Sequence, residues 1–327
     1  LPKGFDYENS SITFFPIGRC YAHSFDDQSC TEINKQQMET FKGWSSDNGY
    51  YTGSIFVGEY YNISSFKSLP IVFSEIIYTD IPWYYQNNAR HFHYMHVPTS
   101  LWGSWTLNNY LLSKMLWNVN SNGENIIDFF LREYYPSTYE TTSIYYNNLE
   151  LASKNIKALK SYIPGTSWNF VNNRLLEGDF FQLDHLKYDS RSITDNDAPS
   201  VVETINAIEK AKLKIEESLM YCNDSIELQR LLIDKKRFDY GYNMYRYIYH
   251  MIRLSMFHKQ GKQNLARLEF KIVTDYVNKL KNIKDVVHVS SSSANSINGF
   301  EATESVKYYY KFKEIYWTKE TETYYKD

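Results

Sequence analysis

The first 125 residues alternate between β-like and helix-like runs, and this alternation constrains the fold more than any other feature of the sequence. Each run rich in β-branched and aromatic residues is followed by a run with apolar residues at helical spacing. Strands joined by helices pair in parallel, because the helix returns the chain to the same end of the sheet. The strand runs cover residues 11–17, 54–61 and 90–98, and the helix runs cover residues 31–44, 70–86 (with an interruption expected at Pro82) and 107–117.

These units predict an α/β fold, but three strands are too few to close a barrel. We therefore expect the C-terminal portion of a (β/α)8 TIM-like barrel, followed by an all-α helical domain. The earlier half of the barrel would then lie upstream of Leu1. The alternative is a small open sheet completed by a segment that the pattern does not reveal.

Beyond residue 125 the pattern becomes helical. Ser225 is a plausible N-cap there, and the tail 300–327 reads as a strand or a docking arm. The expected boundaries are 1–125 for the last strand–helix units, 126–195 for barrel-capping helices and a connecting segment, and 196–327 for the helical domain with its tail. The helix runs cover residues 125–135, 138–160, 201–219, 225–259 and 264–280.

Composition excludes several classes of function. A net charge of −3 gives no footprint for nucleic acid, and no apolar run is long enough to span a bilayer. There is no nucleotide-binding glycine motif and no GxSxG motif, so we expect no cofactor. Cys20 and Cys30 could form a bridge, but with Cys222 the total is odd, and free thiols are the alternative.

The 31 tyrosines and 7 tryptophans suit either packing or the binding of polyhydroxylated ligands. In a parallel α/β barrel, the residues at the carboxyl ends of the strands face the substrate. This rule selects substrate-binding candidates after each strand: Arg19, His23, Asp26 and Asp27, then Tyr60 and Tyr61, then His93, His96, Trp102 and Trp105.

Glu59 is the candidate catalytic residue. It ends the apolar run of the second strand and precedes two tyrosines. Apolar and hydrogen-bonding surroundings tune a carboxyl group for acid–base chemistry near neutral pH. The alternative is a structural glutamate that bonds backbone amides or an arginine such as Arg90.

His91 and His93 occupy alternate positions of the third strand, so both side chains should point to one face while His96 points to the other. Such a pair can ligate a metal in a metal-dependent hydrolase. The other options are hydrogen bonds to a polar substrate or to Asp26 and Asp27, or a place in the wall of the sheet. Because further histidines lie in loops or in the helical region, we expect no metal site.

The remaining candidate binding residues also have a structural interpretation. Arg19, His23 and the acidic pair Asp26–Asp27 would hold hydroxyl or carboxylate groups, or else cap the next helix. Trp102 and Trp105 flank Gly103, which would let a ligand ring approach closely; otherwise these tryptophans cover the end of the barrel.

Several segments resemble the bacterial domain of unknown function 4838. The resemblance rests on Gly18–Asp27, Gly58–Tyr61, Phe92–Met95, Trp102–Gly103 and the helical segments Leu111–Asn118 and Phe129–Tyr135. It covers roughly residues 11–160. It implies a glycoside-hydrolase-like barrel from carbohydrate-degrading bacteria, with some relatives in glycoside hydrolase family 163, whose members act as endo-β-N-acetylglucosaminidases.

We therefore expect a glycoside hydrolase that acts on complex glycans through carboxylate acid–base chemistry, secreted to the periplasm or the cell surface. Its acidic motifs would lie partly in the earlier barrel half. The first alternative is a carbohydrate-binding module without catalysis. The second is a metal-dependent, amidohydrolase-like enzyme that uses His91 and His93.

Overall fold

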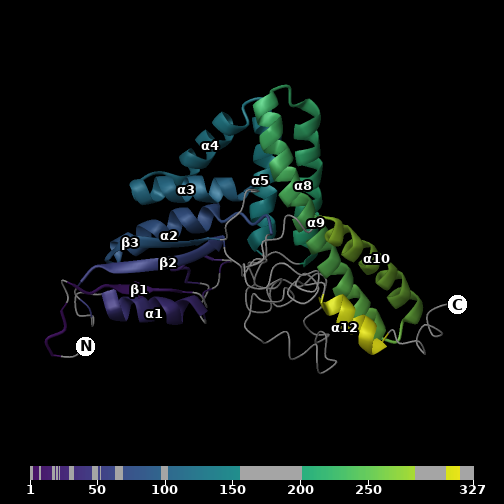
Figure 1. Cartoon of the computed structure of the whole chain (residues 1–327), viewed down its shortest axis with the longest axis horizontal. Helices are drawn as coiled ribbons and strands as arrows, with labels where there is room; N and C mark the ends of the chain where they lie inside the picture. The colour runs from purple at the N-terminus through teal and green to yellow at the C-terminus, as the bar shows by residue number, and fades with distance from the viewer. Residues whose placement is uncertain are drawn as a thin grey trace.

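The computed structural model of the chain (Figure 1) describes residues 3–6, 9–16, 19, 21, 23–28, 33–45, 51, 53–62, 69–96, 102–154, 201–283 and 307–316. Some of the sequence predictions lie outside these residues. They are the loop-like segment 161–195, which the second predicted domain includes, and the bridge between Cys20 and Cys30.

The described strands form a parallel sheet, as the strand–helix alternation predicts. β1 (Ile12–Phe14), β2 (Ile55–Asn62) and β3 (Ala89–His96) lie side by side in chain order. The register pairs Phe14 with Val57, and Val57 in turn with Phe92. This confirms the α/β class, but the described strands do not close a barrel.

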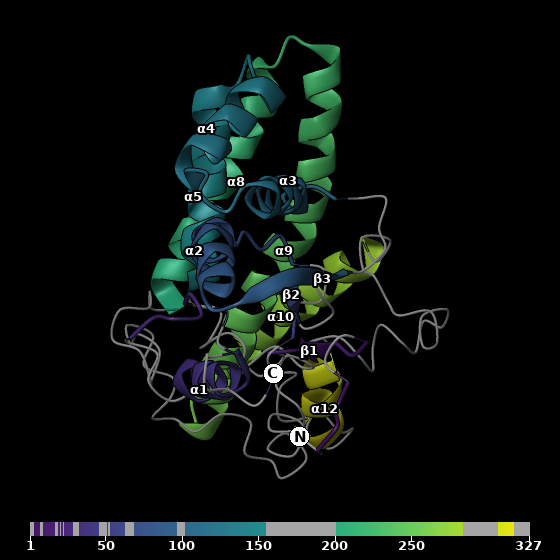
Figure 2. The ribbon, with the colours of Figure 1, turned by 90° about the vertical axis from the view of Figure 1, so that its left-hand side faces the viewer.

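The helices that connect the strands cover one face of the sheet. α1 (Ile33–Ser45) and α2 (Ser74–Gln86) lie on the same side of the strands, as Figure 2 shows. The Phe41 ring of α1 lies 5.2 Å from that of Phe14 in β1 and 5.6 Å from that of Trp83 in α2, measured between ring centres.

The other elements are helices that extend the core away from the sheet (Figure 1). The described helices that follow the sheet are α3 (Trp105–Trp117), α4 (Gly123–Tyr134), α5 (Tyr139–Lys154), α8 (Val201–Tyr221), α9 (Ser225–Lys259), α10 (Gln263–Asn282) and α12 (Lys307–Tyr316). One continuous hydrophobic core runs from α2 and α3 through α5 to α8, α9 and α10.

Three local predictions are wrong. Pro82 does not interrupt α2, which continues to Gln86 although a proline has no N–H to donate to the preceding turn. The N-cap of α9 is Asp224 rather than Ser225, since Asp224 Oδ1 accepts hydrogen bonds from the backbone N–H groups of Ile226 and Glu227 at 2.9 and 2.7 Å. The described part of the tail is the helix α12, not a strand.

The docking alternative for the tail agrees with the structure. Tyr309 and Phe312 of α12 are buried, and the Tyr309 ring stacks 5.4 Å from that of Phe270 in α10. Within the described residues, no helix combines the length and the apolar character needed to cross a membrane.

Candidate functional site

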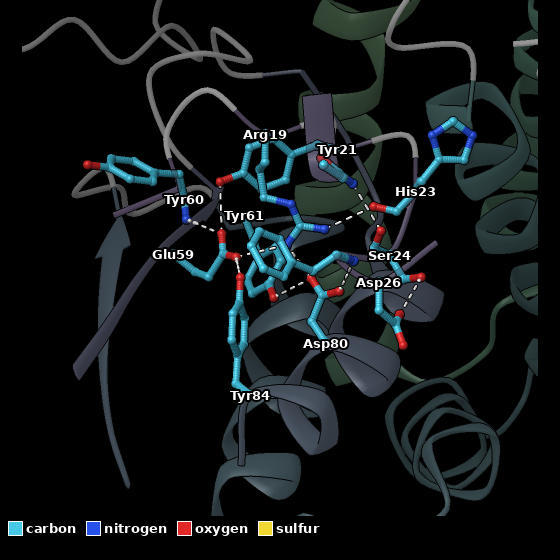
Figure 3. Close-up of polar contacts among 12 residues, drawn as sticks. Arg19, Tyr21, His23, Ser24, Asp26, Glu59, Tyr60, Tyr61, Asp80 and Tyr84 are labelled. Atoms are coloured by element: carbon cyan, nitrogen blue, oxygen red, sulfur yellow. Dashed lines mark hydrogen bonds and ion pairs between the residues drawn. The ribbon is translucent and has the colours of Figure 1, made fainter. Parts of the chain in front are cut away.

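Glu59 lies at the centre of a buried cluster of charges and phenols, which Figure 3 shows. It projects from β2 toward the face covered by the helices, and its side chain is 0% exposed. Arg19 Nη1 donates a hydrogen bond to Glu59 Oε1 at 2.8 Å and another to Asp80 Oδ2 of α2. The partner of Glu59 is therefore Arg19. The guanidinium of Arg90 instead donates to the backbone carbonyls of Tyr85 and Ala89.

Tyrosines complete the shell of this cluster. The hydroxyl groups of Tyr21 and Tyr84 donate to the two Glu59 oxygens at 2.8 and 2.5 Å, and that of Tyr61 donates to Asp80 at 2.9 Å. Burial, together with the charge of Glu59, raises the pKa of Tyr21 and Tyr84 well above its usual value, so both phenols remain donors.

Asp80 receives a backbone hydrogen bond as well. The N–H of Phe25 donates to Asp80 Oδ1 at 2.6 Å, and Arg19 Nη2 donates to the carbonyl of His23 at 2.9 Å. Burial raises the pKa of Asp80 to about 6, although the attraction of Arg19 opposes this shift. The cluster thus ties the loop after β1 to β2 and α2.

This geometry matches the structural alternative for Glu59. A general acid must reach the reacting oxygen directly or through one water molecule, and the Glu59 carboxylate has no exposed surface. Arg19 and Tyr61 are buried in the same cluster. We therefore assign Arg19, Glu59 and Tyr61 a structural role, and we do not propose Glu59 as a catalytic residue.

A cleft of about 190 Å³ lies beside this cluster, where the loop after β1 meets α2 and α5. It brings together His23 and Asp27, both predicted binding residues, whereas Asp26 accepts a hydrogen bond from Ser24 at 3.2 Å and does not line it. The cleft is lined by Tyr21, His23, Ser24, Asp27, Val72, Phe73, Glu75, Ile76, Glu150, Ser153 and Lys154.

Both glutamates that line this cleft, Glu75 and Glu150, make contacts within the protein. Glu75 forms an ion pair of 2.7 Å with Lys154, and Glu150 Oε1 accepts a hydrogen bond from the backbone N–H of Glu75 at 2.8 Å. Burial raises the pKa of Glu150, although that backbone hydrogen bond opposes the shift. The glutamates thus fasten the start of α2 to α5, which favours a structural role for this side of the sheet.

The opposite face of the sheet carries Tyr60 and His93. We call it the open face, since α1 and α2 pack against the other side. In Figure 3, Tyr60 points away from the buried cluster. The open face consists of Phe15, just after β1, and the strand residues Thr13, Phe56, Gly58, Tyr60, His91 and His93.

Phe15 lies between the two predicted binding residues. The centre of its ring is 6.0 Å from that of Tyr60 and 6.1 Å from that of His93, and its side chain is 40% exposed. A Cβ atom on Gly58 would lie 2.0 Å from this ring, so only glycine lets Phe15 rest on β2. Phe15 is not among the predicted binding residues; the glycine inside a strand run was the signal that could have found it.

The two tryptophans predicted to bind substrate lie beside α9 rather than on the open face. Trp105 is buried, donates from Nε1 to the carbonyl of Leu69 at 2.8 Å, and has the Arg237 guanidinium 3.9 Å from its ring. A Cβ atom on Gly103 would lie 3.0 Å from Cβ of Arg237, so this glycine admits α9 rather than a ligand. Trp102 lines a cavity of about 90 Å³ beside α9. The side chain of His96 is outside the described part.

His91 and His93 lie on one face of β3, as predicted, and both are exposed. The His91 ring stacks on Phe56 at 4.2 Å. Among the described residues, no group of three His, Cys, Asp or Glu side chains could hold a metal ion. His91 and Phe56 together therefore provide aromatic surface on this face.

The sequence was compared with protein-family models, with curated proteins and with solved structures, and none of them matches. The functional proposal therefore rests on the geometry of the described residues.

Proposed function

We propose that this chain supplies the glycan-binding wall of a glycoside-hydrolase-like (β/α) barrel. The observation that carries the proposal is the position of Phe15 between Tyr60 and His93, on the open face near the carboxyl ends of the strands. Aromatic rings with polar tips suit sugar rings, which have apolar faces and hydroxyl edges. In a barrel, the substrate site lies at the carboxyl ends of the strands.

The winding of the chain supports the barrel part of the proposal. The strands follow one another in chain order, and α1 and α2 both lie on the outer side. Further strands pairing with β1 and β3 would continue the same curve and turn the open face inward. Phe15, Tyr60 and His93 would then line the mouth of the barrel.

Hydrolysis of a glycosidic bond needs two carboxyl groups that flank the bond. The described strand residues of the open face include no aspartate or glutamate. In the proposal these strands bind and orient the glycan, and carboxylates from outside the described residues act as acid and base. The same observation favours the second candidate, a carbohydrate-binding module without catalysis.

The test is glycan binding by the whole chain. We expect binding on an array of complex glycans that includes N-acetylglucosamine-containing structures, and a loss of about tenfold in affinity for Tyr60→Ala and for Phe15→Ala, since each removes one stacking surface. The matched control is Phe129→Ala, which removes an aromatic ring, 56% exposed, from α4.

Unchanged affinity in both open-face variants would contradict the proposal. Product analysis of the bound glycans then separates the two candidates. Released oligosaccharides indicate hydrolysis, and intact glycans indicate a binding module.

A further inference from the structure

Asp234 is a buried carboxyl group of α9 with one oxygen left over. Its exposed fraction is 2%, and the hydroxyl groups of Tyr135 and Tyr146 both donate hydrogen bonds to Oδ2. Among the described residues, no group donates to the other oxygen, Oδ1. A buried oxygen without a donor is unfavourable, above all when the carboxyl is ionised.

A cavity of about 90 Å³ lies beside this carboxyl group, and we call it the Asp234 cavity. Arg230, which precedes Asp234 by about one turn of α9, lines the same cavity. Its volume equals that of about three water molecules, so a planar guanidinium group fits inside it. The cavity is lined by Trp102, Gly103, Thr106, Tyr134, Arg230, Ile233 and Asp234.

Arg230 and Asp234 have the spacing of an ion pair but do not form one in this structure. An arginine and an aspartate four residues apart on a helix are neighbours on its surface. Arg230 Nη1 instead donates to the backbone carbonyl of Tyr134 at 2.8 Å, and its guanidinium lies 4.1 Å from the centre of the Tyr134 ring. That carbonyl belongs to the last residue of α4, so Arg230 fastens the end of α4 to α9.

The groups around Asp234 are mostly neutral phenols. Burial raises the pKa of Asp234 to about 7, although the hydrogen bonds from Tyr135 and Tyr146 oppose this shift. Burial also raises the pKa of the surrounding phenols, so they stay protonated when the carboxyl ionises. The phenols come from the end of α4 and from α5, and the cations from α9: Tyr134, Tyr135, Tyr145, Tyr146, Arg230 and Arg237.

We propose that Arg230 and Asp234 form a pH-sensitive switch. While the carboxyl keeps its proton, Arg230 stays on the Tyr134 carbonyl, as in this structure. When the proton leaves to solvent, the guanidinium turns into the Asp234 cavity and pairs with Oδ1, because an ionised buried carboxylate needs a counter-charge. This movement releases the end of α4 and changes the packing around Trp102. A local change of charge thus selects between two arrangements of the same side chains.

Trp102 connects the switch to the sheet. It lies in the segment that joins β3 to α3, on the side of the sheet where the strands end. Binding loops of α/β barrels lie on this side. The switch needs no glycan, so it goes beyond the proposed function and does not rest on it.

The experiment follows the Trp102 indole N–H by NMR in the whole chain, with Trp102→Phe to assign the signal. We expect one titration step between about pH 5 and about pH 9 in the unaltered chain. Arg230→Lys, which keeps the charge, should retain it, and Asp234→Asn should abolish it. In Arg230→Gln the midpoint should rise by about one pH unit, because the ionised carboxylate loses its counter-charge.

The matched control is Arg132→Gln, which removes an arginine from an exposed pair of the same spacing with Asp128 on α4 and should leave the midpoint unchanged. Melting curves check that each variant folds. An unchanged midpoint in Arg230→Gln overturns the inference, as does a Trp102 signal that fails to titrate in the unaltered chain or titrates equally in Asp234→Asn.

A second measurement needs no variant. Crystal structures of the unaltered chain on either side of the midpoint should show the Arg230 guanidinium on the Tyr134 carbonyl at the lower pH and beside Asp234 Oδ1 at the higher pH. A guanidinium that stays on the carbonyl in both structures overturns the inference.

Discussion

Arg19 illustrates how a buried charge is retained in this protein. Its guanidinium has two carboxylate partners, Glu59 and Asp80, and it lies over two aromatic rings, with Cζ 4.9 Å from the ring centre of Tyr21 and 5.0 Å from that of Phe25. Removing charged groups from water costs several kcal/mol each, so breaking such a pair leaves a costly unpaired charge. The cluster therefore acts as a single unit.

Glu59→Gln tests this structural part. We expect the free energy of unfolding to fall by about 3 kcal/mol, because Arg19 loses a counter-charge and two phenols compete for one remaining oxygen. Denaturation by urea measures the change, and Glu133→Gln, at an exposed position, should change it by less than about 0.5 kcal/mol. A variant as stable as the unaltered chain would contradict the role.

At the scale of elements, α9 holds the turn between α4 and α5. Glu227, 1% exposed, accepts hydrogen bonds from the backbone N–H groups of Ser137 and Thr138, both at 2.9 Å, and from both hydroxyl groups. These two residues directly precede α5, and the N–H of Thr138 also donates to the carbonyl of Tyr135 at 3.2 Å. A side chain from a distant helix thus fixes the turn from which α5 begins.

We expect Glu227→Ala to lower the free energy of unfolding by about 3 kcal/mol, since the N–H of Ser137 and the hydroxyl groups of Ser137 and Thr138 lose the Glu227 carboxylate, and the N–H of Thr138 keeps only the carbonyl of Tyr135. Amide hydrogen exchange should show faster exchange at the start of α5. The matched control is Glu216→Ala, which removes only a surface pair with Lys212 and should cost less than about 0.5 kcal/mol. Equal losses in the two variants would argue against the capping contact.

At the scale of the whole molecule, two buried acids couple stability to pH. Burial raises the pKa of Asp234 in α9 to about 7, although the hydroxyl groups of Tyr135 and Tyr146 donate hydrogen bonds to it. With Asp80 at about 6, both carboxyls hold their protons more tightly in the folded chain than in the unfolded one. Their joint effect is that stability falls as pH rises from about 4 to about 7.

Asp234→Asn should remove the larger part of this dependence. At pH 8 we expect the variant to be more stable than the unaltered chain by on the order of 2 kcal/mol, because it avoids a buried negative charge. Near pH 3 the two should be alike, since the carboxyl is then mostly protonated in both states. Thermal melts at both pH values measure this, and a constant difference across the range would contradict it.

Much of the fold could be predicted from the sequence, because it depends on local patterns. The helices lie within a few residues of their predicted ranges, and α9 has the bounds 225–259 that its pattern predicts. The error at Pro82 arose where distant contacts override local preference. Pro82 remains inside a helix whose buried residues, such as Ile81 and Trp83, are held by packing.

The candidate site was predicted less well, because spacing along a strand gives the alternation of side chains but not which face is covered. Glu59 and Tyr60 are neighbours, yet one is buried under α2 and the other lies on the open face. The choice between them depends on where Tyr84 and Asp80 of α2 pack. Asp80 and Tyr84 come 21 and 25 positions after Glu59 in the sequence, so the local pattern around Glu59 does not contain this information.

The sequence by itself determined the order of elements, the parallel pairing and the grouping of polar residues after each strand. It did so because hydrophobic periodicity and turn residues act over short distances. Only the tertiary structure decided that Arg19 and Glu59 neutralise each other in the core, while Phe15 and Tyr60 lie on the open face. The physical reason is that burial of a charge requires a partner, and that partner is supplied by packing between distant segments.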